Sequence, residues 1–182
     1  VFYLLSFAIA YAHGAISKEE CMRLTAELQN VPNMLEVVLK TPDNCQYVAS
    51  QLVNKEHLLY IGRGLDYALS MEGSLKLKEI SYIHSESYAA GELKHGTISL
   101  VTNNMPVIAV ATQRELLDKT ISNVKEVKAR GAYVVLVTHG YINVDDEVAD
   151  YKIGLPTIAD LLMPMLTVVP LQLIAYYTSV LR

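Results

Sequence analysis

Residues 57–87 read HLLYIGRGLDYALSMEGSLKLKEISYIHSES and carry three local patterns in succession. The apolar run His57–Ile61 predicts a short buried strand, because it is brief and is followed by glycine. Gly62-Arg63-Gly64 predicts the turn that leaves this strand, and apolar residues at helical spacing predict a helix from about Leu65 to Ser87. A strand, a tight turn and a helix in this order form the building unit of a parallel sheet.

Three helices are expected between an apolar N-terminal helix and this stretch. The first runs over Ser17–Gln29 and begins with a capping box that Glu20 completes. A second, short helix is expected at Pro32–Lys40, because proline is favoured in the first turn of a helix. Thr41-Pro42 opens the third.

Strands and helices continue to alternate after this stretch. Such alternation indicates a doubly wound α/β fold, in which a parallel sheet has helices on both faces and ligands bind at the carboxyl ends of the strands. The Gly62-Arg63-Gly64 turn lies at such an end, so it either binds an anionic substrate or serves backbone geometry alone. The expected strands are Pro106–Ala111, Ala132–Val137 and a weaker Tyr151–Leu155, and the expected helices are Arg114–Arg130, stopped by Gly131, and Thr157–Arg182.

Composition indicates one globular domain without a nucleic-acid surface. About half of the 182 residues are apolar, and the net charge is −4. An acidic balance argues against a nucleic-acid or polybasic membrane surface, so small molecules and other protein chains are the expected partners. Cys21 and Cys45 show no metal-binding or redox spacing and are interpreted as reduced residues of a cytoplasmic protein, with a disulfide left open.

The two ends of the chain are strongly apolar. The opening run stops at His13, short of the roughly 20 residues that span a bilayer, and it lacks a basic leader. Because the chain begins at Val1 within a helical pattern, it is interpreted as a piece of a longer protein. The final helix is apolar nearly all round and must be covered by its own domain or by a neighbouring one. Together with the equally apolar N-terminal helix, it predicts that the isolated chain self-associates.

The helix predicted at 65–87 places charge where an apolar face is expected. On a helical wheel, the expected solvent face consists of Ser70, Ser74, Lys78, Ser81 and Ser85. The opposite side holds Leu69, Leu75, Leu77, Ile80 and Ile83, with Glu72, Lys76 and Glu79 among them. Burying charge without a partner costs several kcal/mol or shifts a pKa, so this pattern predicts a functional site.

Glu79 is the candidate general base of that site. A carboxylate in partly apolar surroundings suits proton abstraction next to a carbonyl group, and the ammonium of Lys76 lies one turn away. The alternative is that Glu72 and Lys76 form a surface ion pair, with Glu79 a bystander.

His95 is the candidate histidine. It precedes Gly96 and is expected at a loop or helix end with an exposed ring, where an imidazole can transfer protons near neutral pH. The other four histidines have no partners in the sequence, and His84 is expected within the long helix. No Walker loop, GxGxxG, HExxH or GxSxG motif is present, which argues against phosphoryl transfer, hydride transfer and metal hydrolysis.

The run EGSLKLKEISYIHSESYAAGELKHG at 72–96 resembles the isomerase segment of the glutamine:fructose-6-phosphate aminotransferases, or glucosamine-6-phosphate synthases, within the sugar isomerase (SIS) family. The resemblance continues through MPVIAVAT at 105–112 and VPLQLIAYY at 169–177. It implies that residues 41–182 form the second of two SIS lobes, a small parallel sheet flanked by helices. Residues 1–40 are then a helical lead-in, made of the tail of the preceding lobe and a linker.

The resemblance also implies a chemistry. Such enzymes transfer ammonia from glutamine to fructose 6-phosphate and isomerise the product to glucosamine 6-phosphate, without an organic cofactor or metal. Glu79 matches the base that moves a proton between C1 and C2, and His95 matches a histidine of sugar ring opening that is supplied across a dimer interface. Lys76 and Glu72 match polar residues of the same pocket. A homodimer or higher homo-oligomer in the cytoplasm, binding a sugar phosphate, is therefore expected.

Other readings remain open at this point. The glutaminase domain, the first lobe with its phosphate-binding loop and the C-terminal tail with its Schiff-base lysine would all lie outside this chain, so the chain alone is not expected to be active. A non-catalytic sugar-phosphate-binding module with a regulatory or scaffolding role is the main alternative. A folding and dimerisation unit is a further one.

Overall fold

A computed structural model describes all residues, 1–182. The strands are β1 (His57–Gly62), β2 (His84–Ala89), β3 (Pro106–Ala111), β4 (Tyr133–His139) and β5 (Tyr151–Leu155). The α-helices are α1 (Phe2–Ala12), α2 (Lys18–Leu39), α3 (Pro42–Leu52), α4 (Leu65–Ser81), α5 (Leu117–Ala129) and α6 (Met163–Leu181). Short 3-10 helices are η1 (Ala90–His95), η2 (Thr97–Leu100) and η3 (Arg114–Leu116).

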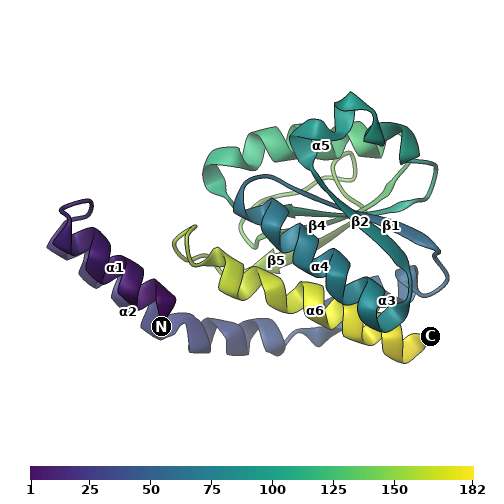
Figure 1. Ribbon diagram of the computed structural model, residues 1–182. Helices are drawn as coiled ribbons and strands as arrows, with labels where there is room; N and C mark the ends of the chain where they lie inside the picture. Colours follow the sequence, from purple (N-terminus) through teal and green to yellow (C-terminus); the bar gives the residue numbers. More distant parts are fainter.

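The five strands form one parallel sheet in the order β2-β1-β3-β4-β5. Helices α3, α4 and α6 cover one face and α5 covers the other, which gives three layers (Figure 1). The predicted doubly wound α/β fold is therefore confirmed. The chain switches direction of travel between β1 and β3, and in such sheets a crevice opens at the carboxyl ends of these two strands.

Alternate residues of the strands supply two separate cores. Tyr60, Ile108 and Val137 point to the face covered by α3, α4 and α6. The residues next to them in the strands, Leu59, Ala109 and Leu136, point to the opposite face and pack towards α5 and η1. Strands buried on both faces need apolar side chains at every position, which is why β1, β3 and β4 were recognisable as continuous apolar runs.

The segment predicted as the last part of the long helix is a strand instead. Helix α4 ends at Ser81, where Tyr82 takes a left-handed conformation with φ of 60°, and β2 then pairs in parallel with β1. His84 therefore lies on β2, and the prediction that it lies within a helix was wrong. The strand HSESYA is polar because it lies at the edge of the sheet, so it lacks the apolar run of a central strand.

The predicted faces of α4 are also wrong in part. Four serines assigned to solvent are buried, namely Ser70, Ser74, Ser81 and Ser85, whereas Leu75 and Ile80 are exposed. Each buried hydroxyl donates to a main-chain carbonyl oxygen; for example, Ser74 Oγ donates to Ser85 O at 3.0 Å and Ser85 Oγ to Ser74 O at 2.8 Å. A serine whose hydroxyl is hydrogen-bonded to a main-chain carbonyl group exposes no unpaired polar atom, so it can pack between a helix and a sheet as alanine does.

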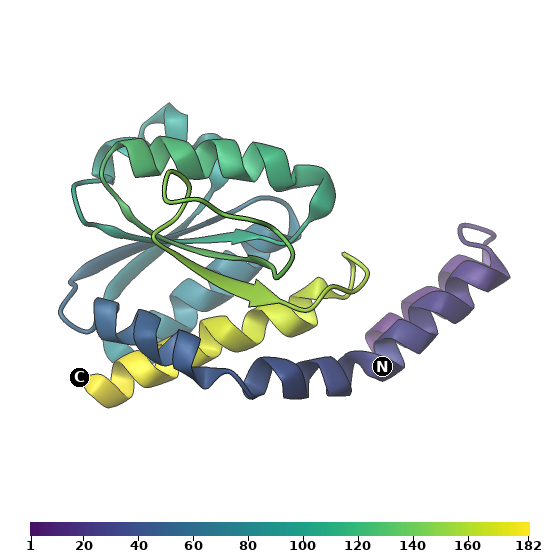
Figure 2. The same ribbon diagram turned by 180° about the vertical axis from the view of Figure 1, so that it is seen from behind.

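At the N-terminus, α1 and the first part of α2 form an arm that extends from the body (Figure 2). The Ser17 side chain accepts from Glu20 N at 3.1 Å, which confirms Ser17 as the predicted N-cap. The Glu20 carboxylate accepts from Arg23 instead, at 2.8 and 2.7 Å, so the second half of the predicted capping box is not formed. Helix α2 runs unbroken through Pro32, so the two predicted helices are one, and its two halves run in different directions as expected of an internal proline. The third predicted helix is confirmed as α3.

Helix α6 is long and apolar enough to cross a membrane by length and composition alone. It packs along α3 and α4, and Leu166, Leu171 and Ile174 are fully buried, as expected for a core helix that its own domain covers. It begins at Met163, later than the predicted Thr157. Both cysteines are free thiols.

Candidate functional site

Three charged side chains of α4 form one cluster. Lys76 Nζ lies 2.8 Å from Glu79 Oε2 and 3.9 Å from Glu72 Oε1, because the three residues are spaced by one helical turn. The hydrogen bond to Glu79 raises the pKa of Lys76 above its ordinary value, with the charges of Glu79 and Glu72 adding to the effect. The ammonium therefore stays charged beside the Glu79 carboxylate.

This cluster is open to solvent within the chain. The side chains of Lys76, Glu72 and Glu79 are 36%, 37% and 47% exposed. The expectation that the apolar side of α4 would shelter them was wrong, because the sheet-facing side of the helix is the serine side. The exposed apolar residues of α4 are Met71, Leu75 and Ile80, so the charged cluster lies on an outer surface of mixed character.

His95 ends η1, next to Gly96. Its ring is 76% exposed, as predicted, and Nε2 lies 3.8 Å from Glu92 Oε2. Gly96 has a φ of 147°, a conformation open to glycine and strained for other residues. The His95 imidazole therefore lies in solvent at the end of a short 3-10 helix, just before a glycine with a positive φ.

The residues of the turn after β1, Gly62-Arg63-Gly64, pack against other residues of the same chain. A Cβ at Gly62 would lie 2.5 Å from the Asp66 carbonyl oxygen, so close backbone approach accounts for this glycine. Gly64 has a φ of +56°, which accounts for the second. Arg63 donates from Nε and Nη2 to Asn123 Oδ1 at 3.1 and 2.8 Å. The geometry thus favours the structural reading of Gly62-Arg63-Gly64 over a direct anion contact.

A carboxylate of the chain itself lies at the carboxyl ends of β1 and β3, where folds of this kind commonly bind ligands. Asp66 is 1% exposed and accepts hydrogen bonds from Thr112 N, Thr112 Oγ1 and Gln113 N at 2.7, 2.5 and 3.1 Å. Burial raises the pKa of Asp66, and these three donors oppose that shift. Backbone N–H groups that would bind a substrate anion at this position are thus occupied.

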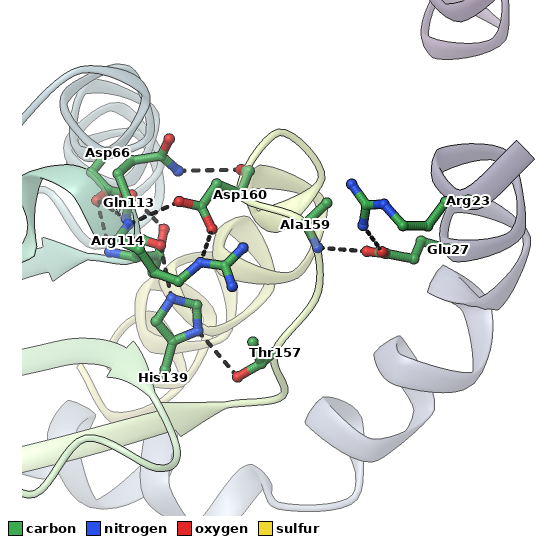
Figure 3. Close-up of polar contacts among 10 residues, drawn as sticks. Arg23, Glu27, Asp66, Gln113, Arg114, His139, Thr157, Ala159 and Asp160 are labelled. Atoms are coloured by element: carbon green, nitrogen blue, oxygen red, sulfur yellow. Dashed lines mark hydrogen bonds and ion pairs between the residues drawn. The ribbon is translucent and has the colours of Figure 1, made fainter. Parts of the chain in front are cut away.

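A hydrogen-bonded network continues along this edge of the sheet (Figure 3). His139 is fully buried; Nε2 donates to Thr112 O at 2.9 Å, and Nδ1 lies 3.3 Å from Thr157 Oγ1. Asp160 accepts from Arg114 N and Nε at 2.9 and 2.6 Å. Sequence reasoning missed Asp66 and His139 because their partners are distant in sequence; an Asp in the first turn of a helix after a glycine turn was the available signal.

Two cavities lie apart from the α4 cluster. One of about 650 Å³ opens at the amino ends of β1, β2 and β3 and includes His57, His84 and Glu86. One of about 300 Å³ lies between α2 and the segment after β5 and includes Arg23 and Arg114. Glu72, Lys76, Glu79 and His95 line neither cavity. No group of His, Cys, Asp and Glu side chains has the arrangement of a metal site.

Comparisons with known proteins agree on a family. The SIS domain profile matches residues 51–182. Proteins named glutamine–fructose-6-phosphate aminotransferase (isomerizing) from Caldanaerobacter subterraneus subsp. tengcongensis and Pseudomonas putida are 49% and 42% identical to the chain over 179 residues. These matches cover 98% of the chain, and the chain spans 29% of the length of each relative.

A solved structure agrees as well. The C-terminal domain of glucosamine-fructose-6-phosphate aminotransferase from Francisella tularensis superposes with a TM-score of 0.90 and 37% identity, covering 97% of the chain and 50% of that domain. The parallel sheet with helices on both faces, the profile match over most of the chain and this superposition lead to one conclusion: the chain belongs to the SIS domain family.

Proposed function

We propose that the chain is the second SIS lobe of the isomerase part of a glutamine–fructose-6-phosphate aminotransferase. Such a protein would convert fructose 6-phosphate and glutamine to glucosamine 6-phosphate and glutamate. The similarity to relatives of that name extends over nearly the whole chain and includes the segment with Glu79 and His95, which supports the proposal. Residues 41–182 would form the lobe, and residues 1–40 the tail of the preceding lobe and a linker.

The observation that carries the mechanism is the contact between Lys76 Nζ and Glu79 Oε2 at 2.8 Å on an accessible surface of α4. A carboxylate that is about half exposed can reach a bound sugar, and the adjacent ammonium stabilises negative charge that develops on the sugar oxygen. Glu79 would move the proton between C1 and C2. Lys76 would hold the carboxylate and Glu72 would complete the polar cluster.

His95 would act in ring opening on a neighbouring subunit. Its exposed ring at the end of η1 is suited to a role outside its own chain, and an imidazole can donate and accept a proton near neutral pH. The site would then need a second copy of the chain, so a homodimer or higher homo-oligomer is proposed.

The charged cluster would be closed by elements outside this chain. Met71, Leu75 and Ile80 flank it and are exposed, which supports a covering lobe at this surface. The chain alone is therefore expected to be inactive. We propose a cytoplasmic enzyme that uses fructose 6-phosphate and needs no organic cofactor or metal.

The test is an assay of the full-length protein that contains this chain. Incubation with fructose 6-phosphate and glutamine should yield glucosamine 6-phosphate, measured by mass spectrometry. Binding of fructose 6-phosphate without any product would contradict the proposal and favour the regulatory or scaffolding module.

A further inference from the structure

The Arg63 guanidinium joins the turn after β1 to helix α5. Nε and Nη2 both donate to Asn123 Oδ1, at 3.1 and 2.8 Å. Asn123 is 5% exposed, and its two contacts with Arg63 bridge 60 positions of sequence. Two donors on one acceptor fix both the position and the plane of the guanidinium.

This guanidinium lies directly against Gly91, the second residue of η1. A Cβ at Gly91 would lie 2.8 Å from Arg63 Nη2, 2.9 Å from Nη1 and 3.0 Å from Cζ. An unattached arginine could move aside, since its end is flexible. Here Asn123 holds the guanidinium, so moving it would break two hydrogen bonds. The absence of a side chain at Gly91 therefore allows η1 to pack directly on the Arg63 guanidinium that Asn123 holds in place.

The rest of η1 is held as well, except at its outer end. Ala90 and Leu93 are fully buried, and Lys94 Nζ lies 2.8 Å from Glu126 Oε1 on α5. His95 follows immediately and has no neighbour within hydrogen-bonding distance. The segment that precedes His95 therefore sets where its backbone lies, and the ring makes no hydrogen bond of its own.

We propose that Arg63, held by Asn123 and seated against Gly91, is a positioning residue for His95. The inference rests on the proposed function, in which His95 acts on the sugar ring. Arg63 acts through the protein: it fixes η1 relative to α5, and η1 delivers the imidazole. A misplacement of about 1 Å can lower turnover on the order of a hundredfold, so a support of this kind matters to the rate.

The first arm of the test measures the support without measuring catalysis. In the full-length protein, hydrogen–deuterium exchange of peptides over 90–95 should rise on the order of tenfold in Arg63→Ala and Asn123→Ala. Asn123→Asp keeps an acceptor oxygen and should retain protection. Arg130→Ala removes an exposed arginine at the end of α5 and is the matched control. Unchanged protection of 90–95 in Arg63→Ala would overturn the support.

The second arm is a double-mutant cycle on glucosamine 6-phosphate formation. Arg63→Ala should lower kcat by roughly tenfold to a hundredfold and leave KM for fructose 6-phosphate within about twofold. Gly91→Ala, which pushes the guanidinium from the other side, should act in the same direction. In a His95→Ala background the Arg63→Ala effect should shrink to about twofold or less, because both changes remove the same contribution.

The outcomes separate this inference from the proposed function. If His95→Ala lowers kcat but Arg63→Ala causes the same loss in both backgrounds, Arg63 does not act through His95 and the inference fails alone. A rise in KM with unchanged kcat would instead make Arg63 a substrate contact, which also overturns it. If His95→Ala leaves kcat unchanged, the proposed role of His95 fails, and the inference fails with it.

Discussion

The positions of several polar side chains are fixed by hydrogen bonds to residues that are far away in the sequence. Asp66 accepts three hydrogen bonds from residues 46 and 47 positions away, and Arg63 reaches Asn123 across 60 positions. Local patterns in the sequence carry no record of such pairs. The exposure of His95 was predictable, because a short segment that ends in glycine is a local feature.

Asp66→Ala tests how much the buried Asp66 carboxylate contributes to stability through its hydrogen bonds at the end of β3. Removing the carboxylate leaves Thr112 N, Thr112 Oγ1 and Gln113 N without their acceptor, and unpaired buried donors cost about 1–3 kcal/mol. The free energy of unfolding, measured by urea denaturation, should fall by about that amount. Asp146→Ala, at an exposed loop position, should change it by less than about 0.5 kcal/mol. Equal effects of the two variants would show that the Asp66 contacts contribute nothing.

Cys45 is predicted to be unreactive in the folded chain. Its side chain is buried in α3, and burial raises the pKa of the thiol to about 11. Only the thiolate reacts, and at pH 8 about one thiol in a thousand is ionised, a fraction that grows as the pH rises towards 11. Mass spectrometry after iodoacetamide treatment should show Cys45 unmodified at pH 8 and modified in denaturant. Rapid native labelling of Cys45 would contradict the packing of α3.

Helix α4 shows what determines an element in this fold. Its strand-to-helix position was predictable from the apolar run and the glycine turn, as were β3, β4, β5 and α5. Its buried face and its end were not, because serines with internal hydrogen bonds pack like small apolar residues. Edge strand β2 was missed for a related reason: it is polar because one edge of it remains unpaired.

Gly73 of α4 is predicted to resist replacement by alanine. In an unconstrained helix Gly→Ala stabilises by about 0.5–1 kcal/mol. Here the added Cβ would lie 2.8 Å from Tyr60 Cε1 and 3.2 Å from Leu171 Cδ1, and both side chains are fully buried. Overpacking should therefore lower the free energy of unfolding by about 1–3 kcal/mol. Lys78→Ala, on the exposed side of the same helix, is the control, and stabilisation by Gly73→Ala would contradict the close packing.

At the scale of the whole molecule, the N-terminal arm carries apolar side chains that the rest of the chain does not cover. Helix α1 exposes Phe2, Leu4, Leu5 and Ile9, and the arm extends away from the sheet (Figure 1). The chain spans 29% of the length of its relatives, and both this arm and the α4 surface are apolar areas of the kind that other protein covers. How the candidate site is closed could not be predicted from this sequence, since under the proposed function the covering groups would belong to another lobe or another copy of the chain.

Sedimentation velocity tests the arm. The isolated chain should self-associate at micromolar concentration, because contiguous exposed apolar side chains favour contact between copies. Replacing Leu5 and Ile9 together by glutamate should weaken this association by placing charge in the contact. Glu36→Gln, at an exposed position on α2, should leave it unchanged. A stable monomer at micromolar concentration would contradict the prediction.

The most direct measurement of the proposed role of Glu79 is a comparison of two activities in the full-length protein. Glu79→Gln keeps the size of the side chain and removes the base, so formation of glucosamine 6-phosphate should fall by about a hundredfold to ten-thousandfold. Hydrolysis of glutamine should remain largely intact, because Glu79 has no part in it. Equal loss of both activities, or unchanged formation of glucosamine 6-phosphate, would contradict the assignment of Glu79 as the base.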